Sequence, residues 1–267
     1  MYRIILITGA SSGLGKETAG FLAAQGHTVY GTSRNPGESL SAVKMVRMDI
    51  TDDLSVRSAI SEIISHEGRI DVVVNNAGIG IGGAIESFSD EEVNLQMNTN
   101  FNGLVRVTRA VLPHMRTSGS GKIINISSIG GLIGLPFQGF YSAAKFAIEG
   151  YSEALAMELK PWNIPVIVVN PGDFKTGFTG SRTITARDAS GSDYRGRVTK
   201  AVEIMGQDEQ SGCDPLLLAK TISKIISRKK PAYRYLVGRF DQRLIARIRH
   251  LLPPGLVRWI IADHYGI

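Results

Sequence analysis

Short runs rich in valine and isoleucine alternate with longer helical stretches along most of the chain, and this alternation limits the fold more than any other feature. Many of the runs are almost continuously apolar, which is typical of strands buried on both faces of a parallel sheet. The predicted strands span residues 3–8, 28–32, 43–48, 71–75, 122–127, 166–170 and 233–237. The predicted helices between them span residues 14–25, 55–67, 90–115, 140–158 and 215–227. We therefore predict an α/β fold, with a doubly wound, seven-stranded parallel sheet flanked by helices and connected by right-handed crossovers.

No internal repeat or long linker divides the chain, so residues 1–238 are predicted to form a single domain. Within it, residues 176–214 contain few apolar residues and many Gly, Ser, Thr and Arg. A loop of this length in a compact domain is usually a lid or a mobile region. We expect it to cover the substrate.

Residues 239–267 are predicted to form a helical extension packed on the same domain. Apolar residues follow helical spacing from Phe240 onward, and arginines occur throughout the same stretch. Such a helix can lie on a membrane surface, or it can cover the substrate cleft or a subunit edge. Asp241 and Gln242 dilute the basic face and no lipidation signal is present, so the covering role is favoured over membrane contact.

The charge and cysteine content exclude several classes of protein. The 30 Lys and Arg exceed the 24 Asp and Glu by six and look scattered, so they do not indicate a nucleic-acid partner. The single cysteine, Cys213, excludes an internal disulfide and fits a reducing compartment. The chain enters an apolar strand at residue 3, which leaves no room for a signal peptide, and no apolar run reaches the ~18 residues of a membrane span. The histidines show no metal-ligand spacing, so we expect a cytoplasmic protein without a metal centre.

The first predicted strand runs directly into a glycine-rich segment, residues 8–15, and a predicted helix follows. The spacing of this segment is G-x-x-x-G-x-G. Glycines here allow a tight turn and a close approach of the backbone to a pyrophosphate, and the helix N-terminus supplies free N–H donors. A purely structural turn can also use glycines, but the strand–loop–helix context favours a dinucleotide. The candidate cofactor residues are Gly9, Ser11, Ser12, Gly13, Leu14 and Gly15.

The end of the second predicted strand favours NADP(H) over NAD(H). A dinucleotide fold meets the adenosine ribose there, and an acidic residue would bind the 2′-hydroxyl of NAD. This chain carries Ser33 and Arg34 instead, and a hydroxyl with a guanidinium suits a 2′-phosphate. After the third strand, Asp49 is a candidate partner of the adenine amino group, although it could also cap a turn or a helix. Its neighbour Ile50 is assigned to the same cofactor site.

Tyr141 and Lys145 are four residues apart and share one face of a predicted helix. A free phenol titrates near pH ~10 and transfers protons poorly at neutrality. A nearby ammonium group lowers the phenol pKa, and a tyrosine tuned in this way can exchange a proton with a substrate oxygen. The pair is weak evidence alone, because a helix with an exposed lysine and a half-buried tyrosine has the same pattern.

Six motifs in a fixed order make the chain resemble the short-chain dehydrogenase/reductase family over nearly all of residues 3–237. They are T-G-x-x-x-G-x-G at 8–15, N-N-A-G at 75–78, the segment 100–103 with the family's helix-kinking asparagine, the strand end 125–128, Y-x-x-x-K at 141–145 and P-G-x-x-x-T at 171–176. The resemblance implies a Rossmann-type catalytic domain that binds a nicotinamide cofactor. It adds to the cofactor site Asn76, Ala77, Gly78, Tyr141, Lys145, Pro171, Gly172 and Thr176.

The resemblance also implies a catalytic set of Asn100, Ser128, Tyr141 and Lys145. The family places its serine thirteen residues before the tyrosine, which selects Ser128 over Ser127. Ser128 would hydrogen-bond the substrate carbonyl, and Tyr141 would donate the proton as hydride arrives from NADPH. Lys145 would lower the pKa of Tyr141 and hold the nicotinamide ribose. The backbone carbonyl of Asn100 would anchor a water that relays protons toward Lys145.

The apolar segment 129–137 is a candidate wall of the substrate site. Such a wall favours a small hydrophobic carbonyl or alcohol substrate of steroid, retinoid or alkyl-ketone type. The segment could equally pack against the core or another subunit. The long loop and the C-terminal extension resemble the hydroxysteroid and retinol dehydrogenase branch of the family.

Two other functions stay open on the sequence alone. A 3-oxoacyl-carrier-protein reductase would need a basic surface for its acidic partner, and four arginines could supply it: Arg182, Arg187, Arg195 and Arg197. A non-catalytic NADP-binding regulator has no need of the complete proton-transfer set, which argues against it. The resemblance further implies a homodimer or homotetramer built on the helices near residues 100–115 and 141–159.

Overall fold

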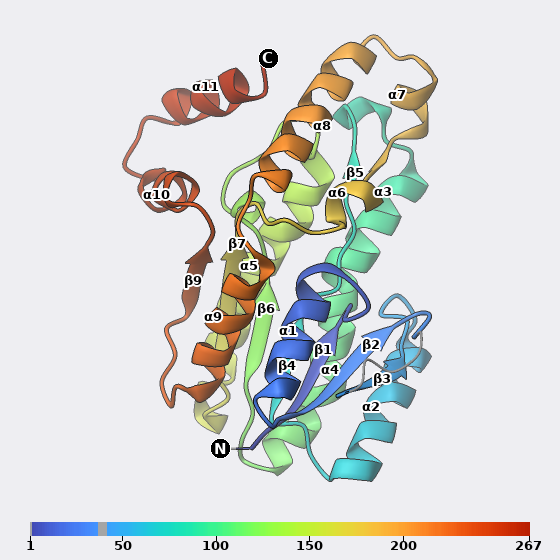
Figure 1. The fold of residues 1–267 in the computed structure, drawn as a ribbon, viewed down its shortest axis with the longest axis vertical. Coiled ribbons are helices and arrows are strands. Elements are labelled where there is room, and N and C mark those ends of the chain that lie inside the picture. Colours follow the sequence, from blue (N-terminus) through green and yellow to red (C-terminus); the bar gives the residue numbers. More distant parts are fainter. Residues whose placement is uncertain (1, 37–41) are drawn as a thin grey trace.

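The computed structural model describes residues 2–36 and 42–267, and a seven-stranded parallel sheet forms its centre (Figure 1). The strands are β1 (Ile4–Thr8), β2 (Thr28–Ser33), β3 (Val43–Arg47), β4 (Val72–Asn75), β6 (Ile123–Ile126), β7 (Val166–Pro171) and β9 (Arg234–Val237). Their order is β3-β2-β1-β4-β6-β7-β9, so the direction of winding reverses between β1 and β4. In doubly wound sheets, ligands bind beyond the carboxyl ends of the strands at this reversal. The predicted seven-stranded sheet is confirmed, and each strand end lies within one residue of its predicted place.

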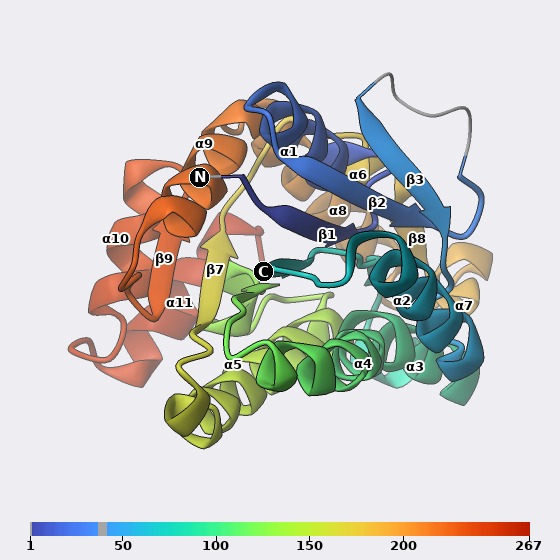
Figure 2. The same cartoon turned by 90° about the horizontal axis from the view of Figure 1, so that it is seen from below.

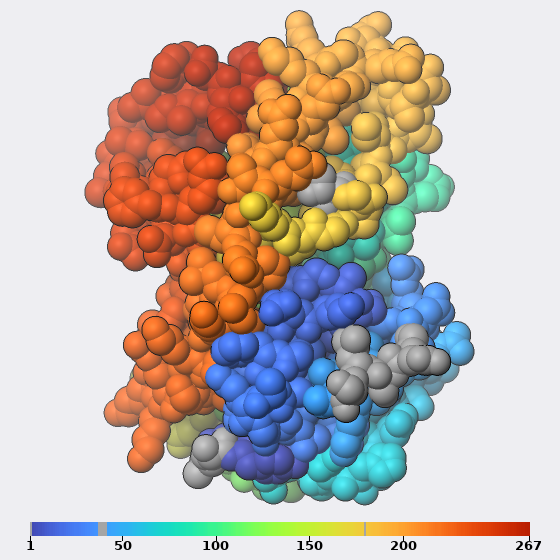
Figure 3. Space-filling view, viewed as in Figure 1, coloured from blue at the N-terminus to red at the C-terminus, as the bar shows by residue number. Residues whose placement is uncertain are grey.

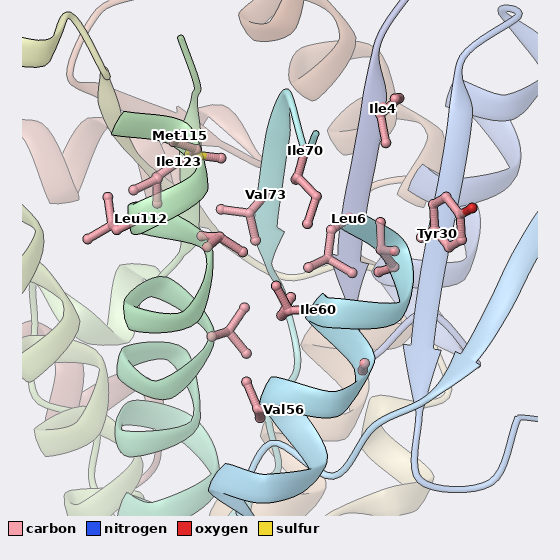
Figure 4. Packing of buried hydrophobic residues seen from close by; sticks show 14 of the residues in the cluster. Ile4, Leu6, Tyr30, Val56, Ile60, Ile70, Val73, Leu112, Met115 and Ile123 are labelled. Atoms are coloured by element: carbon pink, nitrogen blue, oxygen red, sulfur yellow. The ribbon is translucent and has the colours of Figure 1, made fainter. Parts of the chain in front are cut away.

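Alternate residues of each strand face two separate hydrophobic layers. The flanking helices are α1 (Gly13–Ala24), α2 (Asp53–Glu67), α4 (Gly103–Thr117), α5 (Gly139–Glu158) and α9 (Pro215–Ser227). Ile4 and Leu6 of β1 pack with residues of α2, α4 and α5, a cluster of which Figure 4 shows a part. Ile5 and Ile7 pack with α1 and α9, which Figure 2 shows on the opposite side of the sheet from α4 and α5. Because both faces are covered, β1, β4, β6 and β7 are buried at every position, which explains their continuous apolar runs. The edge strands β3 and β9 are partly exposed.

The stretch predicted as one helix over residues 90–115 is interrupted by a π-helical turn. Helix α3 (Asp90–Met97) leads into η2 (Asn98–Asn102), and the first N–H of α4 bonds to the carbonyl of Asn98, five residues earlier. Isolated π turns of this kind are frequent at functional sites. Asn100, the predicted catalytic asparagine, lies in this turn. The remaining short turns are 3₁₀ helices: η1 (Ile85–Ser87), η3 (Ile129–Gly131) and η4 (Lys160–Trp162).

The prediction of a long loop over residues 176–214 is wrong in its secondary structure. This segment contains α6 (Phe178–Ser181), β8 (Thr183–Ile184), α7 (Ala186–Ser190) and α8 (Arg195–Gln210). Strand β8 pairs with β5 (Ile81–Gly82) in a separate two-stranded sheet. The buried side chains of α8 are Val198, Ala201 and Met205, with polar or charged residues at most positions between them. This narrow apolar face gives the sequence too little helical periodicity to be recognised.

The predicted helical extension forms α10 (Phe240–Ile248) and α11 (Pro254–His264). Ala246 of α10 is buried against Leu132 and Ile133, with half-buried side chains of both helices around them. The extension therefore covers part of the apolar segment 129–137, the candidate substrate wall. In Figure 1 it lies beyond the end of β9, at the same end of the molecule as α8.

Candidate active site

The glycine-rich segment turns tightly from β1 into α1, and two of its glycines leave no room for a side chain. Gly9 has a φ of +67°, and a Cβ there would lie 2.8 Å from the Cα of Ala77. A Cβ at Gly15 would lie 2.3 Å from the carbonyl oxygen of Gly9 and 2.4 Å from Nδ2 of Asn76. The loop and the start of α1 are thus packed directly on the segment that follows β4.

Asn76 fixes the shape of this loop through its side chain. Its Nδ2 donates hydrogen bonds to the carbonyl oxygens of Thr8, at 2.9 Å, and Gly9, at 3.2 Å. The hydroxyl of Thr8 in turn accepts from the backbone N–H groups of Asn76 and Ala77, both at 3.0 Å. Gly78 continues this segment toward the catalytic side, where a Cβ at Gly78 would lie 3.3 Å from Oδ1 of Asn100.

The N-terminus of α1 has the features of an anion site. Ser12 precedes the helix but makes no capping hydrogen bond with its side chain, and the first turn holds no acidic residue. The first-turn N–H donors are therefore available to a phosphate, as the sequence predicts for Ser11 through Gly15. Thr176 approaches from the other side, since a Cβ at Gly13 would lie 3.7 Å from the Cβ of Thr176. The glycine loop and the P-G-x-x-x-T segment thus meet, as a shared cofactor site requires.

A pocket of about 610 Å³ lies at the other end of this site, beyond the ends of β2 and β3. It is lined by Arg34, Asn35, Arg47, Asp49, Asp52 and Ser55. Arg34 and Asp49 were predicted for this position, whereas Arg47 was missed. Arg47 lies opposite Ser33 in the parallel register of β2 and β3, which brings a second guanidinium beside the first. In the sequence it is an ordinary arginine at the end of a strand, so only the register could have identified it.

Asp49 and Ile50 occupy different surroundings within the predicted adenine site. Burial opposes ionisation of Asp49, but hydrogen bonds from the backbone and hydroxyl of Thr51 outweigh it, so the pKa of this carboxyl is lowered. Ile50 packs against the start of α4, where a Cβ at Gly103 would lie 2.7 Å from its Cδ1. Its carbonyl accepts a hydrogen bond from Arg106 at 3.3 Å.

Asn100 is buried in the π-helical turn and holds the backbone of Ile79 with both ends of its amide. Its Oδ1 accepts from the N–H of Ile79 at 2.8 Å, and its Nδ2 donates to the carbonyl of Ile79 at 2.9 Å. Its side chain is 1% exposed. The neighbouring Asn98 and Asn102, which share its residue type, are not buried. Asn100 therefore locks the segment after β4 to the helix beside the catalytic face.

Ser127 and Ser128 lie at the end of β6 but have different environments. Ser127 is buried, and its hydroxyl donates to the backbone carbonyl of Lys145 at 3.4 Å. The hydroxyl of Ser128 accepts from the N–H of Gly130 at 3.0 Å. A Cβ at Gly130 would lie 3.3 Å from the Tyr141 ring and 3.4 Å from Oγ of Ser128. Ser128, and not Ser127, therefore meets the phenol.

Tyr141 and Lys145 lie one turn apart on α5, and the ammonium group is 5.7 Å from the centre of the phenol ring. Lys145 donates a hydrogen bond to the carbonyl of Ile126 at 2.9 Å. Burial raises the pKa of the Tyr141 phenol, with the hydrogen bond from Ser128 acting in the opposite direction. The expectation of a lowered phenol pKa is therefore wrong for this arrangement. Burial also lowers the pKa of Lys145 to about 8, and the carboxylate of Glu149 opposes that shift.

Glu149 and Asn170 hold the backbone of Ser128, the predicted catalytic serine, and no motif in the sequence identifies either residue. Asn170 of β7 donates to the backbone carbonyl of Ser128 at 3.0 Å and to Oε1 of Glu149 at 2.6 Å. The other oxygen of Glu149 pairs with Arg234 at 2.6 Å. These side chains therefore link β6, β7 and β9 next to Ser128, one of the predicted catalytic residues.

Gln242 connects the C-terminal extension to the P-G-x-x-x-T segment. Its Oε1 accepts from the N–H of Asp173 at 3.1 Å, and its Nε2 donates to the Asp173 carboxylate. A Cβ at Gly172 would lie 2.1 Å from Oε1 of Gln242, while the preceding Pro171 pairs with Val237 of β9. From the sequence, Gln242 is expected only to dilute a basic helix face, so this contact could not be predicted.

The segment from α6 to α8 supplies a further wall beside Tyr141. The ring of Phe178 lies 6.4 Å from the Tyr141 ring, and the guanidinium of Arg182 lies 5.6 Å from the Phe178 ring. The side chain of Arg182 is 3% exposed and pairs with Glu209 of α8. Residues 176–214 therefore do border the catalytic tyrosine, although as helices and not as a loop.

Comparison with known proteins agrees with this geometry. The family model for short chain dehydrogenases matches residues 3–186. A 3-ketodihydrosphingosine reductase of Bacteroides thetaiotaomicron is 52% identical over 265 residues, which cover 99% of this chain and 98% of that protein. A short-chain dehydrogenase structure from Streptomyces avermitilis has a TM-score of 0.84 at 31% identity, covering 98% of this chain and 96% of that one. A family member from Burkholderia phymatum, solved in complex with NAD, has a TM-score of 0.80 at 22% identity with 93% of each chain covered, and shows the fold alone.

The family model covers more than half of the chain, and the Bacteroides relative covers nearly all of it. The order of the motifs, the sheet topology and the meeting of the glycine loop with Asn76 and Thr176 are consistent with both. The chain belongs to the short-chain dehydrogenase/reductase family and is an oxidoreductase with the fold that binds a nicotinamide cofactor.

Proposed function

We propose that this protein is an NADPH-dependent ketone reductase in which Tyr141 donates the proton to the substrate oxygen. The observation that carries the proposal is that Ser128, Tyr141 and Lys145 lie together. The Lys145 ammonium is 5.7 Å from the centre of the Tyr141 ring, and Ser128 and this ring both lie beside Gly130. The nicotinamide cofactor supplies the hydride when it is bound. The residues around it then have to orient the carbonyl and deliver a proton.

Each residue of the set has a role that its contacts allow. Ser128 donates a hydrogen bond to the substrate carbonyl oxygen and so orients it. Because burial raises the pKa of Tyr141, the phenol is protonated at neutral pH but is a weak acid. Proton transfer from it therefore depends on a group that stabilises the phenolate. Lys145, as an ammonium group, stabilises the phenolate that remains and holds the nicotinamide ribose. Asn100 keeps the π-helical turn in place, and we assign to its backbone carbonyl the water that relays protons toward Lys145.

The pKa of Lys145 predicts the pH dependence of this reaction. Burial lowers this pKa to about 8, so the ammonium is intact at pH 7 and is lost as the pH rises through 8. The phenol stays protonated over this range, because its pKa is shifted upward. We expect kcat/KM for NADPH-driven reduction to be flat below about pH 7 and to fall roughly tenfold per pH unit well above 8. Initial rates from pH 6 to 10, with thermal melts at each pH to exclude unfolding, measure this. A profile that stays flat to pH 10 would contradict the role of Lys145.

The preference for NADP(H) rests on Arg34 and Arg47, because the fold alone is compatible with NAD. The two guanidinium groups line one pocket at the ends of neighbouring strands, where a 2′-phosphate can accept hydrogen bonds from both. Residues 33–35 include no carboxylate that would accept from the 2′-hydroxyl of NAD.

Replacing Arg34 by aspartate tests this preference. Loss of a charge-assisted contact, with a new repulsion of the phosphate, is expected to weaken NADPH binding by about 100-fold, since each tenfold change corresponds to roughly 1.4 kcal/mol. NADH binding should change little. Fluorescence titration of both cofactors measures the two affinities, and Lys220→Asp on the exposed side of α9 is the matched charge reversal. Equal losses for NADPH and NADH would count against the ribose-phosphate role.

For the substrate, we propose the ketone of a long-chain 2-amino-3-keto base of the sphingoid type. The support is the 52% identity to a 3-ketodihydrosphingosine reductase along almost the full length of both chains. An alkyl chain also suits the apolar side chains at Leu132 and Ile133, which α10 backs. NADPH consumption with 3-ketodihydrosphingosine, and a product heavier by two hydrogens in mass spectrometry, would support it. Turnover of 3-oxoacyl-carrier protein, without turnover of the sphingoid ketone, would contradict it.

The two alternative functions have weaker support. For a carrier-protein reductase, Arg182 is withdrawn from the basic surface because it is buried in an ion pair with Glu209, and Arg187 bonds to the backbone of Glu86. A non-catalytic regulator would not need the hydroxyl pair of Ser128 and Tyr141. The homodimer or homotetramer stays a prediction. Exposed apolar side chains on α3 and α5 at Leu95, Phe146 and Met157 suit a subunit interface there.

A further inference from the structure

The C-terminal extension has a second apolar face that the domain does not cover. Among the described residues, fourteen large hydrophobic side chains are exposed, and six of them lie within residues 240–267. Phe240 is 71% exposed, Leu251 is 74% exposed and Trp259 is 63% exposed. The other three are Leu244, Leu256 and Ile267. Exposed apolar groups at this density mark an interaction surface.

Helical spacing separates this outer face from the inner one. Phe240, Leu244 and Leu251 recur at four- and seven-residue intervals along α10 and just beyond it, whereas Ala246 and Ile245 point to the buried cluster. On α11, Leu256 and Trp259 are exposed while Val257 and Ile261 pack inward. Figure 3 shows the extension as a lobe at one corner of the molecule. We call the exposed side of α10 and α11, with Leu251 between them, the outer face.

Arginines lie among the apolar residues of the outer face. Arg243, Arg247 and Arg258 are exposed, and none makes an ion pair within the described part of the chain. Arg239 is paired with Asp241, so that carboxylate is already neutralised, and Asp263 is the exposed acidic residue of α11. Arginine heads above leucine, phenylalanine and tryptophan are characteristic of helices that lie in the interface of an anionic membrane. Among residues 2–36 and 42–267, no helix is both long and apolar enough to cross a membrane.

We propose that the outer face docks on the surface of an anionic lipid bilayer. The inner face of the same helices backs the substrate wall at Leu132 and Ile133, and Gln242 bonds to Asp173 beside the catalytic site. The docked surface is therefore on the same helices that cover segment 129–137 and contact the predicted cofactor segment. A second copy of the chain fits this face poorly, because an isologous contact would bring the arginines of both copies together. The docking proposal rests on the residues of the outer face alone. Delivery of a lipid ketone from the membrane to the enzyme rests in addition on the proposed function.

Vesicle binding tests the docking directly. The full chain is mixed with vesicles of phosphatidylcholine alone or with 30% phosphatidylglycerol, and the sedimented fraction is measured at about 0.05 M and 0.5 M salt. We expect binding to the anionic vesicles, with loss of most binding at high salt. The chain has two tryptophans, so Trp162→Phe leaves Trp259 as the sole indole. Its emission should shift to the blue on binding and be quenched by brominated lipid.

Paired variants locate the contact. Phe240→Ser with Leu251→Ser, and Arg243→Glu with Arg247→Glu, should each lower the partition onto anionic vesicles at least about tenfold. The first pair removes apolar side chains from the contact, and the second reverses two charges that face anionic lipid. The matched controls are Leu54→Ser with Leu217→Ser, which are 70% and 42% exposed, and Lys160→Glu with Lys220→Glu. These should bind as the unmodified chain does, and all variants should keep its melting temperature.

Three results would overturn the proposal. They are no binding to anionic vesicles, equal losses in the control variants, and a fall in molar mass by light scattering in Phe240→Ser/Leu251→Ser, which would identify a second copy as the occupant. Binding without turnover of the sphingoid ketone would leave the docking intact and refute the proposed substrate alone.

Discussion

Replacing Tyr141 by phenylalanine is expected to lower kcat for ketone reduction by about 10³-fold. The change removes the phenol hydroxyl, which is the proposed proton donor. Burial raises the pKa of this phenol, so it carries its proton at neutral pH. Ser128 can still orient the carbonyl, and the glycine loop and Arg34 are untouched. NADPH affinity should therefore stay nearly constant. Initial rates at saturating NADPH and a separate fluorescence titration of the cofactor measure the two effects.

The control for this prediction is Tyr151→Phe on the same helix. Tyr151 is half-buried and stacks edge-on against Phe101, so the variant loses the same atom at a site away from the catalytic set. Its rate should stay within about twofold of the unmodified enzyme. If Tyr141→Phe retained comparable turnover, the mechanism proposed for this protein would have to be abandoned.

Replacing Gly15 by alanine is expected to destabilise the fold and abolish cofactor binding together. The new Cβ would lie 2.3 Å from the Gly9 carbonyl oxygen and 2.4 Å from Nδ2 of Asn76, so α1 must move away from the loop. Overpacking of this kind costs about 3 kcal/mol, which corresponds to a fall in melting temperature of roughly 6–12 °C. The displaced helix N-terminus should also lose its alignment with the pyrophosphate. Thermal denaturation with and without NADPH measures both losses.

The matched control is Gly20→Ala, one turn further along α1. Nothing lies within 4 Å of a Cβ at Gly20, and alanine is the better helix former by about 0.5–1 kcal/mol. The same chemical change should therefore raise the melting temperature at residue 20 and lower it at residue 15. Destabilisation of equal size at both positions would show that the close packing around Gly15 is not the reason that alanine destabilises the protein there.

The sequence predicted the sheet well because burial on both faces leaves a direct trace in it. Strands such as β1 and β7 are apolar at almost every position, so their ends could be located within one residue. Helix α8 failed for the opposite reason. Its buried side chains are Val198, Ala201 and Met205, and polar or charged residues occupy most other positions, so little periodicity distinguishes it from a loop.

Residues of the candidate site could be predicted from the sequence only where they belong to a motif with a defined spacing. The position of Ser128, beside Gly130 and the Tyr141 ring, agrees with the choice of Ser128 over Ser127, although its catalytic role stays a prediction. Arg47 and Gln242 could not be predicted from the sequence. The position of Arg47 depends on the register of β2 and β3, and the contact of Gln242 joins segments about 70 residues apart. The direction of the Tyr141 pKa shift was predicted wrongly. The sequence shows a lysine four residues away but does not show that the phenol is buried, and burial has the largest effect on this pKa.

The Gln242 amide occupies the space in which a side chain at Gly172 would lie. Residues 172 and 242 therefore compete for the same space, although residue 172 lies in the cofactor segment and residue 242 lies in α10, near the end of the chain. A side chain at 172 would push this amide aside and break its two hydrogen bonds to Asp173. An engineer who introduces a larger residue at 172 would therefore loosen the attachment of the C-terminal extension to the cofactor segment.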